Sequence, residues 1–347
     1  MTDAMAPGPV MVDVAGLELT EHERARLRHP QVGGVILFTR NFADREQLTA
    51  LCSAIHQART EPLLIAVDHE GGRVQRFRSG GFTPLPPLRL FGRWYDSQPQ
   101  EALHGATETA FVLASELRAC GVDFSFTPVL DLDYGISQVI GDRALHDKPE
   151  AVALLARALI QGLQQAGMAA CGKHFPGHGA VAADSHLDIP VDGRALDVIL
   201  RQDAAPYGWL GDLALPAVMP AHVIYPEVAP EPAGFSFRWI TEILRGRMGY
   251  DGVVFSDDLT MQGASVAGDI HARAHAALNA GCDMVLVCNR PDLADELLAR
   301  LDRPLDPHSV NRIRRLMPAR AATSWTGLLA DPRYLRARSL RSQNLFS

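Results

Sequence analysis

GVILFTRNFADREQLTALCSAIHQARTEPLLIAVD, residues 34–68, contains the pattern that decides the fold. Two short apolar runs, at 34–38 and 62–68, have the length and the β-branched content of buried strands. Between them, residues 44–59 carry apolar side chains at helical spacing. A strand, a helix and a second strand in this order are typical of the βαβ unit, whose two strands run parallel.

The same kind of apolar run recurs along the whole chain and predicts eight strands. They are PVMVDV (9–14), GVILF (34–38), PLLIAVD (62–68), VDFSFTPV (122–129), AACGKH (169–174), LPAVMPAH (215–222), DGVVFSDD (251–258) and DMVLVC (283–288). Helical periodicity separates most of them, as at 104–121, 149–167 and 268–281, each of which ends in glycine.

Eight strands alternating with helices predict an α/β fold, a single-domain (β/α)8 barrel of the TIM type that need not be regular. The alternative is a doubly wound open sheet, but no G-x-G-x-x-G follows an early strand. We expect residues 1–305 to form the catalytic barrel. Residues 306–347 are expected to form a C-terminal helix and tail that pack on it.

Composition narrows the class of protein. The 347 residues carry a net charge of −7, which argues against non-specific nucleic-acid binding, and we interpret the basic C-terminal segment as a solvated helix and tail. Five cysteines without C-x-x-C spacing argue against a disulfide framework. Neither a signal peptide nor an apolar run of about 18 residues is evident. We therefore expect a cytoplasmic protein that does not bind membranes.

Polar residues stand where the expected strands end. In barrels of this type the catalytic groups lie at the carboxyl ends of the strands. The polar ends are Asp13, Asp68, Asp131, Lys173 with His174, His222, and Asp257 with Asp258. One end of the barrel is therefore expected to collect carboxylates, a lysine and histidines.

FSDDLTMQG (255–263) places two adjacent carboxylates after an apolar strand. Side chains alternate along a strand, so Asp257 and Asp258 cannot both point into the barrel mouth. One is expected to face the substrate while the other caps the next helix. The alternative is that both are capping acids.

GKHFPGHGAVAADSHLD (172–188) follows the fifth strand with a long Gly/Pro-rich loop. Asp184 lies two residues before His186 and can accept a hydrogen bond from its imidazole N–H. Such a pair can exchange a proton near neutral pH. The alternative is a polar surface loop without a chemical role, and for His178 we favour that interpretation.

A metal site is a minority interpretation of the same residues. Its ligands would be His174, His178, His186, His222 and Asp257. The H-x-x-x-H spacing lies in a Gly/Pro loop, without the helix that would bring both rings to one face. We therefore expect neither a metal nor another cofactor.

AVDHEGGRVQRF (66–77) is the third chemical signal. A carboxylate at a strand end, such as Asp68, can accept hydrogen bonds from two sugar hydroxyls, while arginines donate to sugar oxygens. Glu70 and Arg73 are interpreted as a structural ion pair. IGDRAL (140–145) offers a further arginine, Arg143, after the fourth strand.

These motifs, in this order, resemble glycoside hydrolase family 3. VDHEGGRVQR, GDRAL, GKHFPGHG followed by DSH, PAHVIY and SDDLTMQGA carry the resemblance, which runs from about residue 10 to 300. The chain looks most like the bacterial cytoplasmic β-N-acetylglucosaminidases of that family. The resemblance implies a single barrel, without the second domain of larger family members, that acts on a small carbohydrate. Nothing in the sequence suggests an obligate interface, so we expect a monomer.

The resemblance also implies a retaining mechanism and a role for each site residue. Asp257 would be the nucleophile, His186 the acid/base and Asp184 its partner. The terminal GlcNAc would be held by Asp68, Arg76, Arg143, Lys173 and His174. The implied substrate is muropeptide-derived GlcNAc-β-1,4-anhydroMurNAc, with or without the stem peptide, in peptidoglycan recycling.

Three positions depart from the family's usual pattern. His69 stands where Gln is common, Leu145 where Phe is common, and Gln262 where Glu is common. None replaces a proposed catalytic group, so fine specificity is affected more than reaction type. Phosphorolysis by the same site, a metal-dependent amidohydrolase and a catalytically silent sugar-binding protein remain alternatives.

Overall fold

All eight expected strands are present and form one sheet. The computed structural model describes residues 5–185 and 188–344. Every neighbouring pair of strands in this sheet is parallel, in the order β6-β3-β2-β1-β12-β11-β8-β7. The strands are β1 (Val10–Asp13), β2 (Val32–Leu37), β3 (Leu64–Val67), β6 (Phe124–Ser125), β7 (Cys171–Phe175), β8 (Ala217–Pro220), β11 (Val253–Asp258) and β12 (Met284–Val287).

The sheet curls back on itself between its two outer strands. Isolated parallel bridges join Phe124 to Ala169 and Val129 to Lys173, alongside β6 and β7. The result is a nearly closed barrel, and the doubly wound alternative is wrong. Because β6 has only two residues, the seam is held largely by the chain that follows it.

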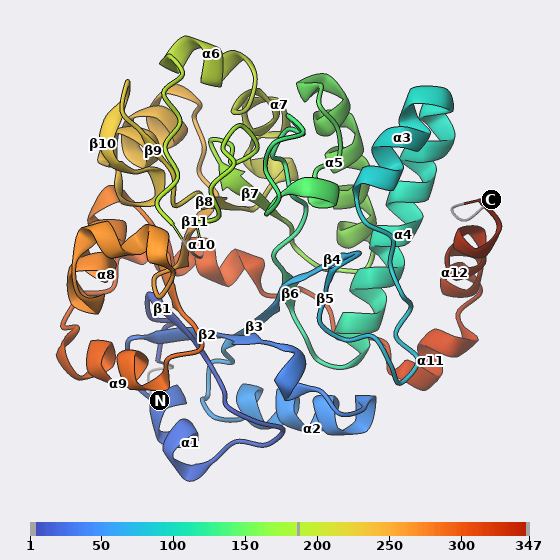
Figure 1. Cartoon of the computed structure of the whole chain (residues 1–347). Coiled ribbons are helices and arrows are strands. Elements are labelled where there is room, and N and C mark those ends of the chain that lie inside the picture. The colour runs from blue at the N-terminus through green and yellow to red at the C-terminus, as the bar shows by residue number, and fades with distance from the viewer. Residues whose placement is uncertain (1–4, 186–187, 345–347) are drawn as a thin grey trace.

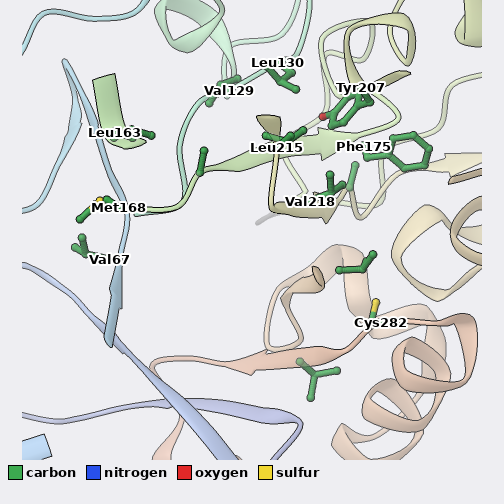
Figure 2. Packing of buried hydrophobic residues seen from close by; sticks show 14 of the residues in the cluster. Val67, Val129, Leu130, Leu163, Met168, Phe175, Tyr207, Leu215, Val218 and Cys282 are labelled. Carbon is green, nitrogen blue, oxygen red and sulfur yellow. The ribbon is translucent and has the colours of Figure 1, made fainter. Parts of the chain in front are cut away.

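Alternation along the strands separates two apolar layers. In β1, Met11 belongs to the cluster that fills the barrel, whereas Val10 and Val12 belong to the cluster between the strands and the helices. Figure 2 shows part of this outer layer, in which Phe175 and Tyr207 pack edge to face with ring centroids 5.2 Å apart.

Helices cover the outside of the barrel (Figure 1). They are α1 (Glu21–Leu27), α2 (Arg45–His56), α3 (Arg89–Ser97), α4 (Pro99–Ala119), α5 (Pro149–Gln165), α6 (Leu196–Arg201), α7 (Ala205–Ala214), α8 (Ile270–Ala280) and α9 (Pro291–Arg300). The predicted helical segments overlap α2, α4, α5 and α8. Gly281 ends α8 with φ of 114°, a conformation that favours glycine.

Several short elements interrupt the regular alternation of strands and helices, in line with the expectation that the barrel need not be regular. They are η1 (Thr39–Asn41), the hairpin β4 (His69–Gly71) and β5 (Val74–Gln75), η2 (Gly141–Arg143), the hairpin β9 (Ile224–Tyr225) and β10 (Ala229–Pro232), η3 (Ala233–Phe235), the π-helical η4 (Arg238–Arg247) and η5 (Gln262–Ala267). The β4–β5 hairpin and η2 follow barrel strands and carry charged residues that were singled out in the sequence.

The C-terminal segment packs on the barrel. In α10 (Pro307–Leu316), Ile313 and Leu316 join the apolar cluster inside the barrel. Arg312 pairs with Asp251 at 2.6 Å and with Asp283 at 3.2 Å, immediately before β11 and β12, so α10 closes the amino-terminal end of the barrel. Helices α11 (Trp325–Ala330) and α12 (Pro332–Asn344) pack on α4. The division of the chain at residue 305 stays a prediction.

Within the described part of the chain, no helix has both the length and the apolar character needed to cross a bilayer.

Candidate active site

A pocket opens at the carboxyl ends of the barrel strands. Leu64 and Ala66 of β3 point into the barrel, so the period of two directs Asp68 into its mouth. The same alternation brings Lys173 from β7 and Asp257 from β11 to the pocket. The fold therefore brings strand ends that are far apart in sequence together in the lining of one pocket.

The pocket has a volume of about 340 Å³. It brings together all the predicted site residues that lie in the described part of the chain: Asp68, Arg76, Arg143, Lys173, His174, Asp184 and Asp257. His186, the predicted acid/base, lies outside the described residues. Apolar side chains from other strand ends, such as Phe38, Phe126 and Met219, complete the lining.

A network of ion pairs forms one side of the pocket. Lys173 Nζ lies 2.8 Å from Asp68 Oδ1 and 2.7 Å from Glu70 Oε1. Arg143 donates two hydrogen bonds to Glu70, of 2.9 and 2.8 Å, and Arg76 lies 3.5 Å from Asp68. Alternating charges thus hold the Asp68 carboxylate and the Lys173 ammonium group at the pocket surface, where sugar hydroxyls can reach both.

The network keeps its buried members ionised. Burial by itself raises the pKa of Glu70, but Arg143 and Lys173 outweigh it and hold that pKa well below its usual range. Burial by itself lowers the pKa of Lys173, but Asp68 and Glu70 leave it raised. Both groups therefore stay charged at neutral pH.

The expected ion pair between Glu70 and Arg73 is wrong. Arg73 instead lies 3.3 Å from Asp142 and donates to backbone carbonyls of residues 138–140. Glu70 is buried beneath the pocket, where barrel closure brings it to Arg143 and Lys173. These contacts span 73 residues or more in sequence, beyond the reach of local spacing arguments.

His174 is oriented by a buried carboxylate. Its Nδ1 lies 2.7 Å from Asp131 Oδ2, and its backbone N–H donates to the same carboxylate at 3.2 Å. Burial raises the pKa of Asp131, but the two neighbouring histidines, His174 and His178, leave it lowered. An ionised Asp131 fixes the Nδ1–H tautomer of His174, whose Nε2 can then accept a hydrogen bond.

The two carboxylates at the end of β11 have different surroundings. Asp257 lies in the pocket wall and its Oδ1 accepts the Asp258 N–H at 2.8 Å. Asp258 does not cap a helix as expected. It accepts hydrogen bonds from the Thr260 N–H, the Thr260 hydroxyl and the Cys288 N–H. Burial raises the pKa of Asp258 to about 6, and its bonds tie the β11 end to the β12 end.

Two further histidines of the metal interpretation, His178 and His222, are buried. His178 is 3% exposed, so its interpretation as a residue on a polar surface loop is wrong. Its Nε2 lies 3.2 Å from Ser185 Oγ, and His222 Nε2 lies 3.1 Å from the Asp258 carbonyl. Residues 5–185 and 188–344 contain no group of three or more His, Cys, Asp or Glu that could hold a metal ion.

A family model, the glycosyl hydrolase family 3 N-terminal domain, matches residues 10–316. The chain belongs to glycosyl hydrolase family 3. It is a glycoside hydrolase, so the catalytically silent alternative is wrong. The family-3 barrel accounts for the position of the pocket at the carboxyl ends of the strands.

Relatives of high identity support this assignment. A protein of Bordetella avium named β-hexosaminidase is 71% identical over 339 residues, which cover 98% of this chain and 96% of the relative. The crystal structure of NagZ from Neisseria gonorrhoeae in complex with N-trifluoroacetyl-D-glucosamine is 48% identical. It has a TM-score of 0.93, with 99% of each chain covered.

A second crystal structure of gonococcal NagZ is a complex with a zinc ion. It is 47% identical to this chain, with a TM-score of 0.92 and 99% of each chain covered. Independence of the family-3 enzyme from metal therefore stays a prediction, to be tested with a chelator.

Two residues of the family-3 site were not assigned their roles by sequence reasoning. Asp131 was recognised only as one of the polar strand ends, and Glu70 only as a partner for Arg73. The signal for both was the same, a carboxylate just beyond an apolar strand. What they contact depends on which strands the barrel brings together.

His69, one of the three departures from the family pattern, lies in a buried aromatic environment. It is 1% exposed, and its ring lies 5.7 Å from that of Phe77 and 6.2 Å from that of Phe82. Within the described structure its Nδ1 has no hydrogen-bond partner. Burial lowers its pKa to about 3, so the folded protein keeps this ring neutral.

We expect His69→Gln to make the enzyme more resistant to mild acid. Between about pH 6.5 and 3 the unfolded chain binds a proton on His69 that the folded chain does not, so stability falls as pH falls. The loss attributable to His69 between pH 7 and pH 5 is about 2 kcal/mol. Urea unfolding at both pH values measures it.

The matched control for this prediction is His275→Gln, which changes an exposed histidine. It should leave the pH dependence of unfolding as in the parent chain. If His69→Gln and the parent lose the same stability from pH 7 to pH 5, the assignment of a neutral buried His69 is wrong.

Proposed function

We propose that the chain is a retaining exo-β-N-acetylglucosaminidase that removes a terminal, non-reducing GlcNAc. Asp257 attacks C1 of the sugar and forms a covalent glycosyl-enzyme. His186, paired with Asp184, protonates the leaving oxygen and then takes a proton from the attacking water. Asp68, Arg76, Arg143, Lys173 and His174 hold the sugar hydroxyls.

The observation that carries this proposal is the single pocket that brings all the described candidates together. Its volume of about 340 Å³ is at the small end for ligand sites, which suits one sugar residue. Charged donors and acceptors line one side, and a strand-end carboxylate, Asp257, belongs to the same lining. The sugar-like ligand of gonococcal NagZ supports a GlcNAc-type substrate.

The proposed substrate is GlcNAc-β-1,4-anhydroMurNAc derived from muropeptides, with or without peptide. The proposed role is cytoplasmic peptidoglycan recycling by a monomer. The support for this substrate and role is the resemblance in the catalytic motifs, while the names of the relatives support only the hexosaminidase activity.

The test is the release of 4-nitrophenol from 4-nitrophenyl β-GlcNAc, with the product anomer followed by NMR. Retention gives β-GlcNAc as the first product.

Phosphate-free and phosphate-containing buffers separate hydrolysis from phosphorolysis, because only the latter gives GlcNAc-1-phosphate. A strong chelator should leave the rate unchanged. Inverted product or chelator-sensitive turnover would refute the mechanism.

We expect His186→Ala to lower kcat/KM more for a substrate with a poor leaving group than for a substrate with a good one. A good leaving group needs little protonation, so kcat/KM for 2,4-dinitrophenyl β-GlcNAc should fall less than about tenfold. For a natural disaccharide it should fall about 10³-fold. The comparison requires only steady-state rates on the two substrates. Equal losses on both would remove His186 from the acid/base role.

A further inference from the structure

Ser185 connects the loop that follows β7 to its own first residues and to the segment that follows β11. The residue is 3% exposed and follows Asp184 of the pocket wall. Its hydroxyl lies 3.2 Å from His178 Nε2, and its carbonyl accepts the Gly263 N–H at 2.9 Å. One buried serine therefore joins the start of the loop, the middle of the loop and the segment after β11.

His178, one of the two partners of Ser185, is held in place by a hydrogen bond of its own. The backbone N–H of His178 donates to Asp131 Oδ1 at 2.7 Å, and the other oxygen of Asp131 holds the ring of His174. Burial lowers the pKa of His178, so its ring is neutral at neutral pH and can share a single proton with the serine hydroxyl. Hydrogen bonds thus link the His174 ring to Asp131 and Asp131 to the His178 backbone, and the His178 ring in turn contacts Ser185.

The contact between Ser185 and Gly263 is a close approach of two backbone segments. A Cβ at Gly263 would lie 2.9 Å from His222 Cβ and 3.2 Å from the Ser185 carbonyl oxygen. Glycine allows the two backbones to approach closely enough for the hydrogen bond. Gly263 lies five residues after Asp258, on the segment that leaves the strand of the proposed nucleophile.

We propose that Ser185 is a positioning residue for the glycosidase reaction, and that its contacts with His178 and Gly263 hold Asp184 at the pocket. The inference rests on the proposed function, in which Asp184 orients the acid/base that follows Ser185. Ser185 does not touch the reacting atoms. It acts by fixing the distance between the proton donor's partner and the wall that carries Asp257.

The experiment compares Ser185→Ala with the parent enzyme on phenyl, 4-nitrophenyl and 2,4-dinitrophenyl β-GlcNAc. Loss of one hydrogen bond that positions the acid should lower kcat/KM about tenfold for the phenyl glycoside. It should lower kcat/KM less than about threefold for the dinitrophenyl glycoside, which needs little protonation. A purely structural role would lower all three equally.

Two further sets of variants make the comparison specific. Ser137→Ala also removes a buried hydroxyl, one without a hydrogen-bond partner in the described chain, and should leave all three rates unchanged. His178→Leu should reproduce the Ser185→Ala pattern, and the double variant should be no worse than the worse single variant. His178→Gln, which retains a hydrogen-bonding group, should recover part of the loss.

The outcomes separate this inference from the proposed function. If His186→Ala shows the dependence on leaving group and Ser185→Ala does not, the positioning role of Ser185 is overturned while the acid/base assignment stands. If neither variant shows it, the acid/base assignment fails first and the inference fails with it. If both show it and the double-variant losses multiply, His178 and Ser185 act separately and the path between them is wrong.

Discussion

Asp257→Asn is expected to lower kcat by at least about 10⁴-fold on every β-GlcNAc substrate, activated or natural. In the proposed mechanism the Asp257 carboxylate forms the covalent bond, and an amide in its place cannot, so leaving-group ability does not compensate. This uniform loss contrasts with the graded loss expected for His186→Ala. Steady-state rates on 2,4-dinitrophenyl β-GlcNAc and on a natural disaccharide measure both patterns.

Asp258→Asn is the matched control for the proposed nucleophile, Asp257. Asp258 is adjacent in sequence, but its oxygens accept hydrogen bonds from Thr260 and Cys288, which an amide oxygen can partly retain. We expect a much smaller loss of kcat. Trapping with a 5-fluoro GlcNAc donor, which keeps the 2-acetamido group, should label the peptide that contains Asp257. A label on any other residue, or substantial turnover by Asp257→Asn, would move the nucleophile elsewhere.

The fold was predictable because each strand is a local pattern. The apolar run at 62–68 and the helical spacing at 44–59 need no knowledge of the rest of the chain, and β3 and α2 follow them closely. The β4–β5 hairpin and η4 were not predicted. The hairpin has only three and two residues in its strands, too few for an alternation of polar and apolar side chains to be recognised.

The candidate site was predictable as a set of residues but not as a set of contacts. Strand-end position identified Asp68, Lys173 and Asp257, because barrels place such residues at one mouth. The partner of Glu70 was assigned incorrectly because Arg73 is its neighbour in sequence, whereas Arg143 and Lys173 are its neighbours in space. His178 was misjudged for the same reason. Its glycine-flanked position suggests a surface loop, and only the packing of that loop shows that the ring is buried.

The second large effect expected is from Lys173→Met, which should lower both stability and activity. Lys173 is 2% exposed and lies within 2.8 Å of Asp68 and 2.7 Å of Glu70. When the Lys173 ammonium group is removed, the carboxylates of Asp68 and Glu70 remain close together with less positive charge beside them. Breaking a buried ion pair from one side costs about 3 kcal/mol or more. Urea unfolding should show this loss, and KM for 4-nitrophenyl β-GlcNAc should rise because Asp68 loses a partner that holds it at the pocket.

The double variant Lys173→Met with Glu70→Gln separates the two effects. Removing the Glu70 charge relieves the repulsion but also breaks the pair that Glu70 forms with Arg143, so the stability lost in the double variant should be smaller than the sum of the two single losses, a coupling that a double-mutant cycle measures. Activity should stay low in the double variant, because the donor beside Asp68 is still missing. If stability falls by less than about 1 kcal/mol in Lys173→Met, as for an exposed ion pair, the network is not the buried support that its contacts indicate. If activity recovers together with stability, Lys173 acts only through folding and not at the sugar.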